Sequence, residues 1–594
     1  MKLARLMGLT VLVVMMMVTL TATTQATTYT WTHGGGDTNW TTTANWSGGT
    51  YPGSADTANL TNTGVGTVSV NGAQTVDTVS LQNSSGNYTL SGNTLTINTK
   101  IEQTAAATNT VSSALAGSGT LSVLAGTLNL TATSTIGSLN LGGATLSFSG
   151  STLTLTGATA ITASGTNSLT GGSSLAWSGD KIINVTSGTT TSAWYMSGGS
   201  GMSITVSGAG TFTNTNTWSL GNMTADGGNY NYQGSSTSGQ TITTLTAKNG
   251  GTWTTSGGVV NGDITITNPL SLNGGTISGQ RKLSIQGGAA SNMVVSDGTS
   301  TLSASVWLQN QTRNIVVNSG TLTLSSTHIE NNQSITKTGT GTLVLSGTLD
   351  TAWGGGTLLA SAGTTFLNGS LNRGVTASSG ATVGGSGTVT NTVSIPTGAH
   401  LAPGANAVGH LTANVLTLGN SAICDFEFNA TPANDYVAVS TSGGLTIGTG
   451  ETVNLYAEGT TNQWTGTGTY TLFTYSGTLN GSASNLSVGN PIGGQTYTFA
   501  SNGSQVTLTI TAGSGAPNAP SNLTATTISN TQINLAWTDN SSNETGFIID
   551  RALDSGFTLS LTTVTVAANA SSASARDDST AFRNARNPNA VRIP

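Results

Sequence analysis

The chain has 594 residues, of which only 6% are charged and 36% are hydrophobic, and its formal net charge is −6. This balance excludes a disordered chain, which combines low hydrophobicity with high charge, and the lack of a basic stripe excludes nucleic acid as a partner. The 81 glycines, together with the abundant Thr, Ser and Asn, indicate short strands joined by tight turns, because Thr suits a pleated sheet and Gly or Asn suits positive φ.

The first predicted element is a secretory signal peptide over residues 1–26. Lys2 and Arg5 precede an apolar run from Leu6 to Leu20, and small residues lead to Ala26, after which we expect cleavage. The run of 15 residues is shorter than the roughly 20 that cross a bilayer as a helix. We therefore expect a secreted, extracellular or cell-surface protein with no transmembrane segment in the mature chain.

Residues 27–58 form a Trp-rich segment. It contains Trp31, Trp40 and Trp46, three of the 11 tryptophans of the chain, and an Asn precedes each of the last two. The first coil of a solenoid has an open apolar end, so we interpret this segment as an N-terminal cap. The alternative is a ligand platform, in which the three rings stack against sugars.

From residue 59 to residue 400, short apolar runs recur every seven to eleven residues, separated by Gly, Asn or Ser. Examples are Leu121-Ser122-Val123, Leu128-Asn129-Leu130, Leu139-Asn140-Leu141, Leu146-Ser147-Phe148 and Leu153-Thr154-Leu155. Each run places its apolar side chains on one face and a polar side chain on the other, which is the period of a β-strand. No window has a sustained helical period.

A repeated string supports a stack of coils. Gly-x-Gly-Thr, followed by an apolar or aromatic residue, begins at Gly117, Gly208, Gly339, Gly385 and Gly466. A turn-then-strand unit that recurs without helices is typical of a solenoid, with roughly 20–30 residues per coil and about 4.8 Å of rise. The sequence therefore predicts an all-β fold, a right-handed parallel β-helix of about 11–17 coils; a β-sandwich is the second choice, disfavoured because longer strands are scarce.

The stretch ITKTGTGTLVLSG at residues 335–347, with GGGTL at residues 354–358, resembles the autotransporter-associated β-strand repeat, or passenger-associated transport repeat. GSGTV at 385–389, LAPG at 401–404, GHL at 409–411 and NDYV at 434–437 resemble the passage that follows this repeat in large bacterial surface proteins. The Trp-rich start is similar to the opening of the same proteins. The resemblance implies a β-helical passenger that is exported and displayed or released outside the cell, and it implies no reaction.

Residues 401–510 are predicted to continue as a C-terminal β-helix or β-strand region. The single cysteine, Cys424, lies in an alternating strand there, so we interpret it as a buried small hydrophobic residue, with a free thiol as the alternative. Residues 511–520 have the composition of a linker.

Residues 521–570 resemble the first strands of a fibronectin type III domain, in which Trp537 would be the core tryptophan. Residues 571–594 form an atypical tail, because the last 19 residues hold four of the 15 basic residues of the chain. We interpret this shift as truncation or a shifted reading frame, and we expect a small, incomplete β-sandwich.

The acidic residues are too scattered for catalysis. A polysaccharide hydrolase needs two carboxylates about 5–9.5 Å apart, but only eight acids lie between residues 77 and 350, mostly more than a coil apart: Asp77, Glu102, Asp180, Asp226, Asp263, Asp297, Glu330 and Asp350. Glu330 and Asp350, with His328, are the one trio close in sequence. Four His and one Cys form no metal-ligand pair, so we predict no catalytic residue, no metal and no cofactor.

Two functions from different classes remain open. The first is a structural or adhesive surface protein without catalysis, with extracellular glycans or other surface proteins as partners. The second is a carbohydrate-binding or polysaccharide-degrading β-helix, for which the clustered tryptophans are the main support. Acids gathered over one groove of the folded chain would favour the second.

Overall fold

The protein is almost entirely β. The computed structural model describes residues 25–172, 174–234, 239–256, 263–286, 292–307, 312–325, 329–330, 334–347, 356–430, 433–512, 517–529, 532–541, 544, 546–551, 562–576 and 591–592. Strands account for 59% of the residues and helices for 1%, and parallel stacked coils form a β-solenoid of about 16 turns. The predicted all-β solenoid is therefore confirmed. Residues 1–24 of the predicted signal peptide lie outside the described residues.

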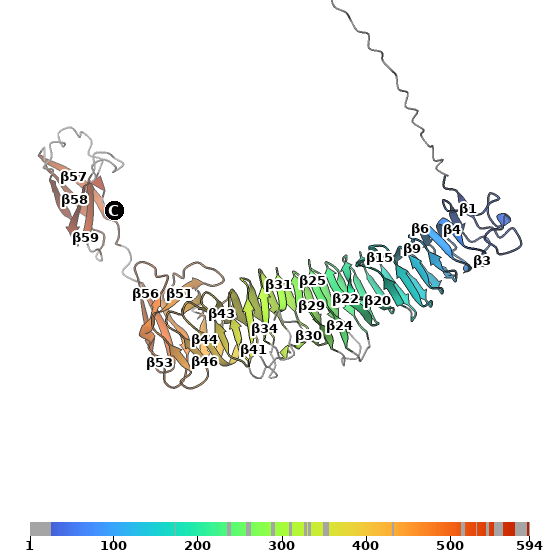
Figure 1. Ribbon diagram of the computed structural model, residues 1–594. Coiled ribbons are helices and arrows are strands. Elements are labelled where there is room, and N and C mark those ends of the chain that lie inside the picture. Colours follow the sequence, from blue (N-terminus) through green and yellow to red (C-terminus); the bar gives the residue numbers. More distant parts are fainter. Residues whose placement is uncertain are drawn as a thin grey trace, which may run out of the picture. The chain divides into compact units, whose positions relative to one another are not determined.

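The N-terminal unit comprises residues 1–310 and 318–330. Its coils contribute strands to two parallel sheets. In the first sheet the early strands are β2 (Thr57–Leu60), β4 (Gln74–Leu81), β6 (Leu95–Gln103), β9 (Thr120–Val123) and β12 (Ser138–Gly142). In the second they are β3 (Thr67–Val70), β5 (Thr89–Gly92), β7 (Thr108–Val111), β10 (Thr127–Leu130) and β13 (Thr145–Phe148). The colours of this unit change step by step along the stack in Figure 1, because each coil follows the previous one in sequence.

Inward apolar side chains stack from coil to coil and form the core. Leu128 of β10 pairs with Leu146 of β13, and Leu130 pairs with Phe148, with all four side chains fully buried. Each such side chain contributes roughly 1.5–3 kcal/mol by leaving water. The alternation seen in the sequence therefore marks which residues face the core.

From residue 240 onward, one strand of each coil belongs to a separate, short sheet. It consists of β24 (Gln240–Ile242), β27 (Ile264–Ile266), β30 (Leu283–Ile285), β33 (Val306–Trp307) and β36 (Ile329–Glu330), all parallel. Ile264, Ile266, Leu283 and Ile285 are fully buried. The coils of this region therefore enclose their core with three sheets.

The Gly-x-Gly-Thr strings lie at turns that lead into strands, as predicted. The threonines of the first four strings begin β9, β21 (Thr211–Asn214), β38 (Thr342–Leu345) and β44 (Thr388–Ile395). Gly117 has a φ of 107°, and a Cβ there would lie 2.3 Å from the carbonyl oxygen of Ile97. Only glycine fits that position, because the turn passes directly over the backbone of the preceding coil.

The C-terminal unit comprises residues 311–317 and 331–594. One sheet of its solenoid contains β37 (Ile335–Thr338), β39 (Leu358–Ala360), β42 (Val375–Ala377), β44, β46 (His410–Leu418), β49 (Tyr436–Val439) and β50 (Leu445–Ile447). The facing sheet contains β38, β40 (Thr364–Leu367), β43 (Thr382–Gly385), β45 (His400–Pro403), β47 (Ile423–Asn429), β51 (Glu451–Ala457) and β54 (Leu486–Val488). The parallel coils thus extend into the predicted region 401–510, as far as β54.

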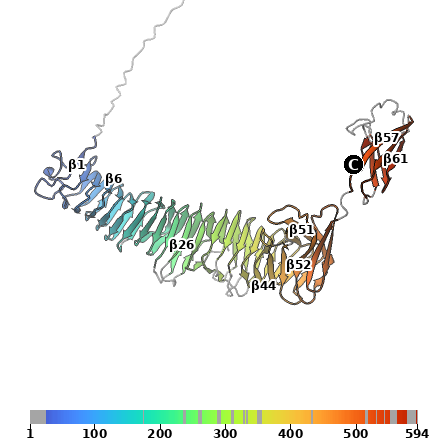
Figure 2. The ribbon, with the colours of Figure 1, turned by 180° about the vertical axis from the view of Figure 1, so that it is seen from behind.

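The last coils change from parallel to antiparallel pairing. β52 (Gly468–Thr474) pairs in parallel with β49 but antiparallel with β56 (Gln505–Ala512), which also pairs antiparallel with β55 (Gln495–Ser501). Figure 2 shows β51 and β52 in this part of the unit. The described residues contain only two short 3-10 helices, η1 (Thr43–Asn45) and η2 (Ala483–Asn485), and neither has the length or apolar character to cross a membrane.

The chain ends in two small antiparallel sheets. One contains β57 (Ser521–Ser529), β58 (Gln532–Thr538) and β61 (Ser572–Arg576), and the other contains β60 (Thr562–Ala567), β59 (Gly546–Arg551) and β62 (Val591–Arg592). They share a core of Leu535, Trp537, Phe547 and Ile549. The residues 571–594 thus contribute β61 and β62 to the sheets. The fibronectin type III resemblance stays a prediction.

Candidate functional site

The three tryptophans of residues 27–58 meet in one cluster. The side chains of Trp31 and Trp40 are fully buried, and Trp46 is 3% exposed. The Trp46 ring packs edge-on against both others, with centroid distances of 5.0 Å to Trp31 and 4.9 Å to Trp40. Trp46 Nε1 donates to the carbonyl oxygen of Trp40 at 2.7 Å. Their ring faces are therefore covered in this structure, and the sugar platform stays a prediction that would require the segment to open.

The asparagines that precede the tryptophans hold the segment's loop. Asn45 is fully buried, and its Nδ2 donates to Asp37 Oδ1 at 2.9 Å and to the carbonyl oxygen of Asn39 at 3.0 Å. The backbone N–H of Asn39 donates to Asp37 Oδ1 at 2.9 Å, and this hydrogen bond lowers the pKa of Asp37. The backbone N–H of Trp40 donates to the carbonyl oxygen of Ser69 in β3, which attaches the loop to the first coils.

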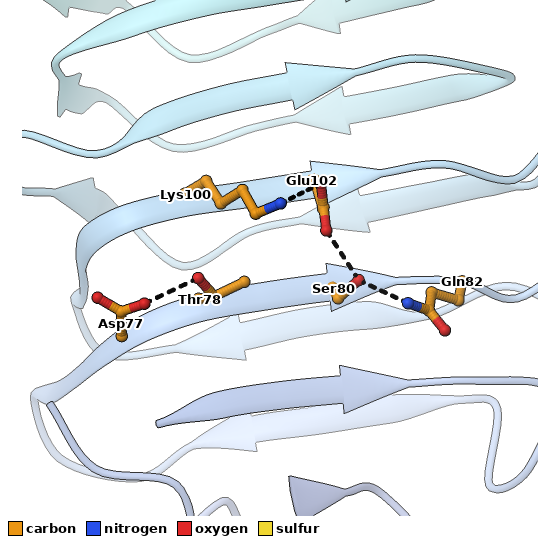
Figure 3. A network of polar contacts seen from close by, with 6 residues as sticks. All are labelled: Asp77, Thr78, Ser80, Gln82, Lys100 and Glu102. Atoms are coloured by element: carbon orange, nitrogen blue, oxygen red, sulfur yellow. Dashed lines mark hydrogen bonds and ion pairs between the residues drawn. The ribbon is translucent and has the colours of Figure 1, made fainter. Parts of the chain in front are cut away.

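A polar network lies on β4 and β6, on the face that points away from the core (Figure 3). In the parallel register Thr78 pairs with Lys100 and Ser80 pairs with Glu102. Lys100 Nζ lies 2.8 Å from Glu102 Oε2, and Ser80 Oγ donates to Glu102 Oε1 at 3.2 Å. Asp77 Oδ2 instead accepts a hydrogen bond from Thr78 Oγ1 at 3.0 Å. The two carboxylates therefore have separate partners.

Replacing Lys100 with methionine is expected to lower the free energy of unfolding by no more than about 1 kcal/mol, because exposed ion pairs contribute about 0.2–1 kcal/mol. The Lys100 side chain is 40% exposed, so water screens its attraction to Glu102. Urea unfolding of both proteins measures the difference. A loss above about 2 kcal/mol would mean that the network is a major source of stability.

The other acids named from the sequence are also bonded locally. Asp180 Oδ1 accepts from the backbone N–H of Ser203 at 3.0 Å, and Asp226 Oδ2 lies 3.0 Å from Lys248 Nζ. Of the trio named above, His328 and Asp350 lie outside the described residues, and Glu330 ends β36. The structure therefore does not test whether that trio converges.

A set of acids that the sequence analysis did not single out gathers in the C-terminal unit. A shallow hollow of about 440 Å³ lies beside β47 and the end of β51, and it is lined by Asn406, Glu427, Gly459, Thr460, Thr461 and Asn462. Glu427 Oε2 accepts from the backbone N–H of Gly459 at 3.1 Å. Burial raises the pKa of Glu427, as does the nearby carboxylate of Glu458. The signal was the alternation Asp425-Phe426-Glu427, which places both carboxylates on the outward face of one strand.

Asp435 joins three segments next to this hollow. Its side chain is fully buried, and its Oδ1 accepts from the backbone N–H of Gly409 and its Oδ2 from that of Glu427, each at 2.8 Å. A Cβ at Gly404 would lie 2.3 Å from Asp435 Oδ1, so the turn packs directly on this carboxyl group. The motifs LAPG, GHL and NDYV, which are apart in sequence, therefore meet around Asp435.

Two further contacts link the same coils. The ring of His410 stacks on Tyr436 at a centroid distance of 4.8 Å. His400 Nδ1 lies 2.7 Å from Asp425 Oδ2, whose Oδ1 accepts from Asn454 Nδ2 at 2.8 Å. The hydrogen bond to Asp425 raises the pKa of His400. His400, Asp425 and Asn454 thus form a ladder across β45, β47 and β51.

Lys337, within the stretch that resembles the autotransporter repeat, is enclosed by backbone. It is fully buried, and its Nζ donates to the carbonyl oxygens of Gly339 and Ala362, each at 2.7 Å, and to that of Gly341. A Cβ at Gly363 would lie 2.5 Å from this Nζ. The lysine of the repeat thus joins the turn before β38 to the next coil.

Within the described residues, no group of three or more His, Cys, Asp or Glu side chains has an arrangement that could hold a metal ion. The single cysteine, Cys424, is fully buried, and burial raises the pKa of its thiol. No protein-family model and no curated protein matches this chain. The resemblance to autotransporter passengers therefore depends on the motifs themselves.

Proposed function

We propose that this chain is a secreted or cell-surface β-solenoid with a structural or adhesive role, similar to an autotransporter passenger, and that it acts without catalysis. The observation that supports this proposal is that two of its buried ionisable groups, Lys337 and Asp435, bond to the scaffold. Lys337 joins a turn to the next coil, and Asp435 joins two loops to a strand. General acid–base catalysis instead needs titratable groups directed at a substrate bond. Extracellular glycans or other surface proteins are the proposed partners.

Antibody labelling tests the proposed location. Antibodies against the solenoid are expected to bind intact producing cells or to detect the protein in the culture medium. An antibody against an abundant cytoplasmic protein should give no signal on the same cells. Retention of the chain inside intact cells would contradict the proposal.

A polysaccharide screen is expected to find no hydrolase or lyase turnover by the full chain. The control is the Glu427→Gln variant, prepared and purified in the same way. Turnover by the unmodified chain that is abolished in Glu427→Gln, Glu330→Gln or Asp350→Asn would overturn the non-catalytic proposal.

The second candidate function, carbohydrate binding or degradation, is favoured by the hollow beside Glu427. Amide and hydroxyl groups line it, and such groups bind sugar hydroxyls. Burial and the Glu458 carboxylate also raise the pKa of Glu427, which is the direction that favours a proton donor. Glycan binding that is lost in Asn462→Ala and Glu427→Gln, without turnover, would support a binding module; turnover lost in Glu427→Gln would support an enzyme.

A further inference from the structure

The coils from residue 400 to residue 512, here called the acidic coils, carry acidic groups without basic partners. The sequence contains no Lys or Arg between residues 374 and 550. The acidic coils themselves contain five carboxyl side chains, namely Asp425, Glu427, Asp435, Glu451 and Glu458, and two histidines, His400 and His410. A carboxyl group buried in these coils therefore has no lysine or arginine of the same coils to offset its charge.

Glu451 is the clearest case. It begins β51, its side chain is fully buried, and neither carboxyl oxygen has a hydrogen-bond partner among the described residues. Glu451 Oε1 and Asn420 Oδ1 both lie beside Gly448. A Cβ built on this glycine would lie 2.6 Å from the first oxygen and 2.7 Å from the second. A carboxylate cannot donate to Asn420, whereas a protonated carboxyl group can. Burial also raises the pKa of Glu451.

Asp435 is the second buried carboxyl group. The hydrogen bonds from Glu427 N and Gly409 N favour its ionised form, but burial opposes them and the carboxylates of Glu427 and Glu458 add repulsion. Burial has the largest effect and raises the pKa of Asp435 to about 8. The folded chain therefore keeps the proton of Asp435 to a higher pH than the unfolded chain does.

Carboxylates, a thiol and aromatic rings face these two carboxyl groups, and of these only Glu427 and Glu458 raise the pKa of Asp435. Asp435 faces Glu427 from β47 and Glu458 from the end of β51, and the next residue, Tyr436, stacks on His410 of β46. Glu451 faces the Cys424 thiol of β47, and β54 contributes no titratable residue. None of these facing groups is a lysine or arginine, and His410 contacts Tyr436 through ring stacking.

We propose that protons on Glu451 and Asp435 hold the acidic coils in their folded form, and that these coils loosen as rising pH removes the protons. His400 also stabilises the folded coils less as pH rises, because its raised pKa reflects stabilisation of its charged form by Asp425. A group whose pKa is raised by folding stabilises the folded state fully below its unfolded pKa and loses that stabilisation as pH rises to the folded pKa. For Asp435 the window runs from its ordinary value of 3.8 to about 8.

Hydrogen exchange measured by mass spectrometry on the full chain tests the proposal. After correction for the intrinsic exchange rate, the opening constant of the acidic coils is expected to rise at least about tenfold between pH 5 and pH 8. The reason is that a closed state that binds one proton more than the open state has an opening constant that rises about tenfold per pH unit. Residues 103–170 contain no titratable side chain and serve as an internal control whose opening constant should not change. An unchanged opening constant in the acidic coils would overturn the proposal.

Two variants separate this effect from general destabilisation. Glu451→Gln keeps the size of the side chain but removes its titration, so the rise with pH should be reduced; Glu102→Gln, in β6, should leave the rise unchanged. A rise that is identical in unmodified protein, Glu451→Gln and Asp435→Asn would contradict the assignment to these groups.

Infrared spectroscopy of the unmodified protein gives a second test that does not depend on the folding of a variant. At pH 7 ordinary surface carboxyl groups are ionised, so an absorption band from protonated carboxyl groups is expected only if buried ones retain protons. This band should decrease by pH 9. Its absence at pH 7 would overturn the proposal, whichever function the chain has.

Discussion

Replacing Trp40 with alanine is expected to lower the free energy of unfolding of the first coils by about 3–5 kcal/mol, the usual effect of deleting a buried tryptophan side chain. The ring is fully buried against Trp46, and the backbone of Trp40 bonds to Ser69 of β3. The cavity would therefore weaken the contact between the Trp-rich segment and β3. Urea unfolding monitored by hydrogen exchange in β2–β6 measures the loss.

Trp40→Phe is the matched control. Trp40 Nε1 has no hydrogen-bond partner among the described residues, so phenylalanine removes volume without breaking a bond and should be less destabilising than alanine. A Trp40→Ala protein that keeps its stability but loses glycan binding would instead support the aromatic platform.

Replacing Lys337 with methionine is expected to lower the free energy of unfolding by at least about 3 kcal/mol, because it strips three carbonyl acceptors of a buried partner and each costs about 1–3 kcal/mol. Methionine fills a similar space but cannot donate to the carbonyl oxygens of Gly339, Gly341 and Ala362. The loss should be local to β37, β38 and β40, as shown by faster hydrogen exchange there.

Lys100→Met provides the comparison for this prediction. Both lysines lie on strands of the solenoid, but Lys100 is 40% exposed and bonds to a side chain, whereas Lys337 is fully buried and bonds to backbone. Equal losses for the two substitutions would show that the carbonyl contacts of Lys337 add nothing to stability.

The fold could be predicted because its two main rules are local. In runs such as Leu128-Asn129-Leu130, alternation alone identifies the buried side chains, and turn glycines such as Gly117 and Gly126 mark positions where a Cβ would meet the preceding coil. These features depend on neighbours in sequence. The sequence does not show that β24 to β36 form a sheet of their own, because earlier coils also have three strands, of which two, such as β11 (Ser134–Ile136) and β12, belong to the first sheet.

The candidate sites were harder to predict because they depend on contacts between coils. Asp425 and Glu427 lie outside the stretch between residues 77 and 350 that holds the eight scattered acids, and their spacing to Glu458 gives no indication that the chain brings them together. The sequence also does not show whether Trp40 is buried or exposed, because a buried cap and an exposed ligand platform have the same Trp-rich composition. The sequence shows Asp435 only as part of the motif NDYV, whereas its two backbone hydrogen bonds are visible only in the fold.

The pairing between coils is independent of the length of the turns. Thr127 pairs with Thr145 after 18 residues, Thr145 pairs with Ser168 after 23, and Ile423 pairs with Thr452 after 29, yet each pair lies in a parallel register. Insertions at a turn can therefore accumulate without shifting any core residue. Each coil offers evolution, or a protein engineer, a separate place to attach a new loop while the rest of the scaffold stays unchanged.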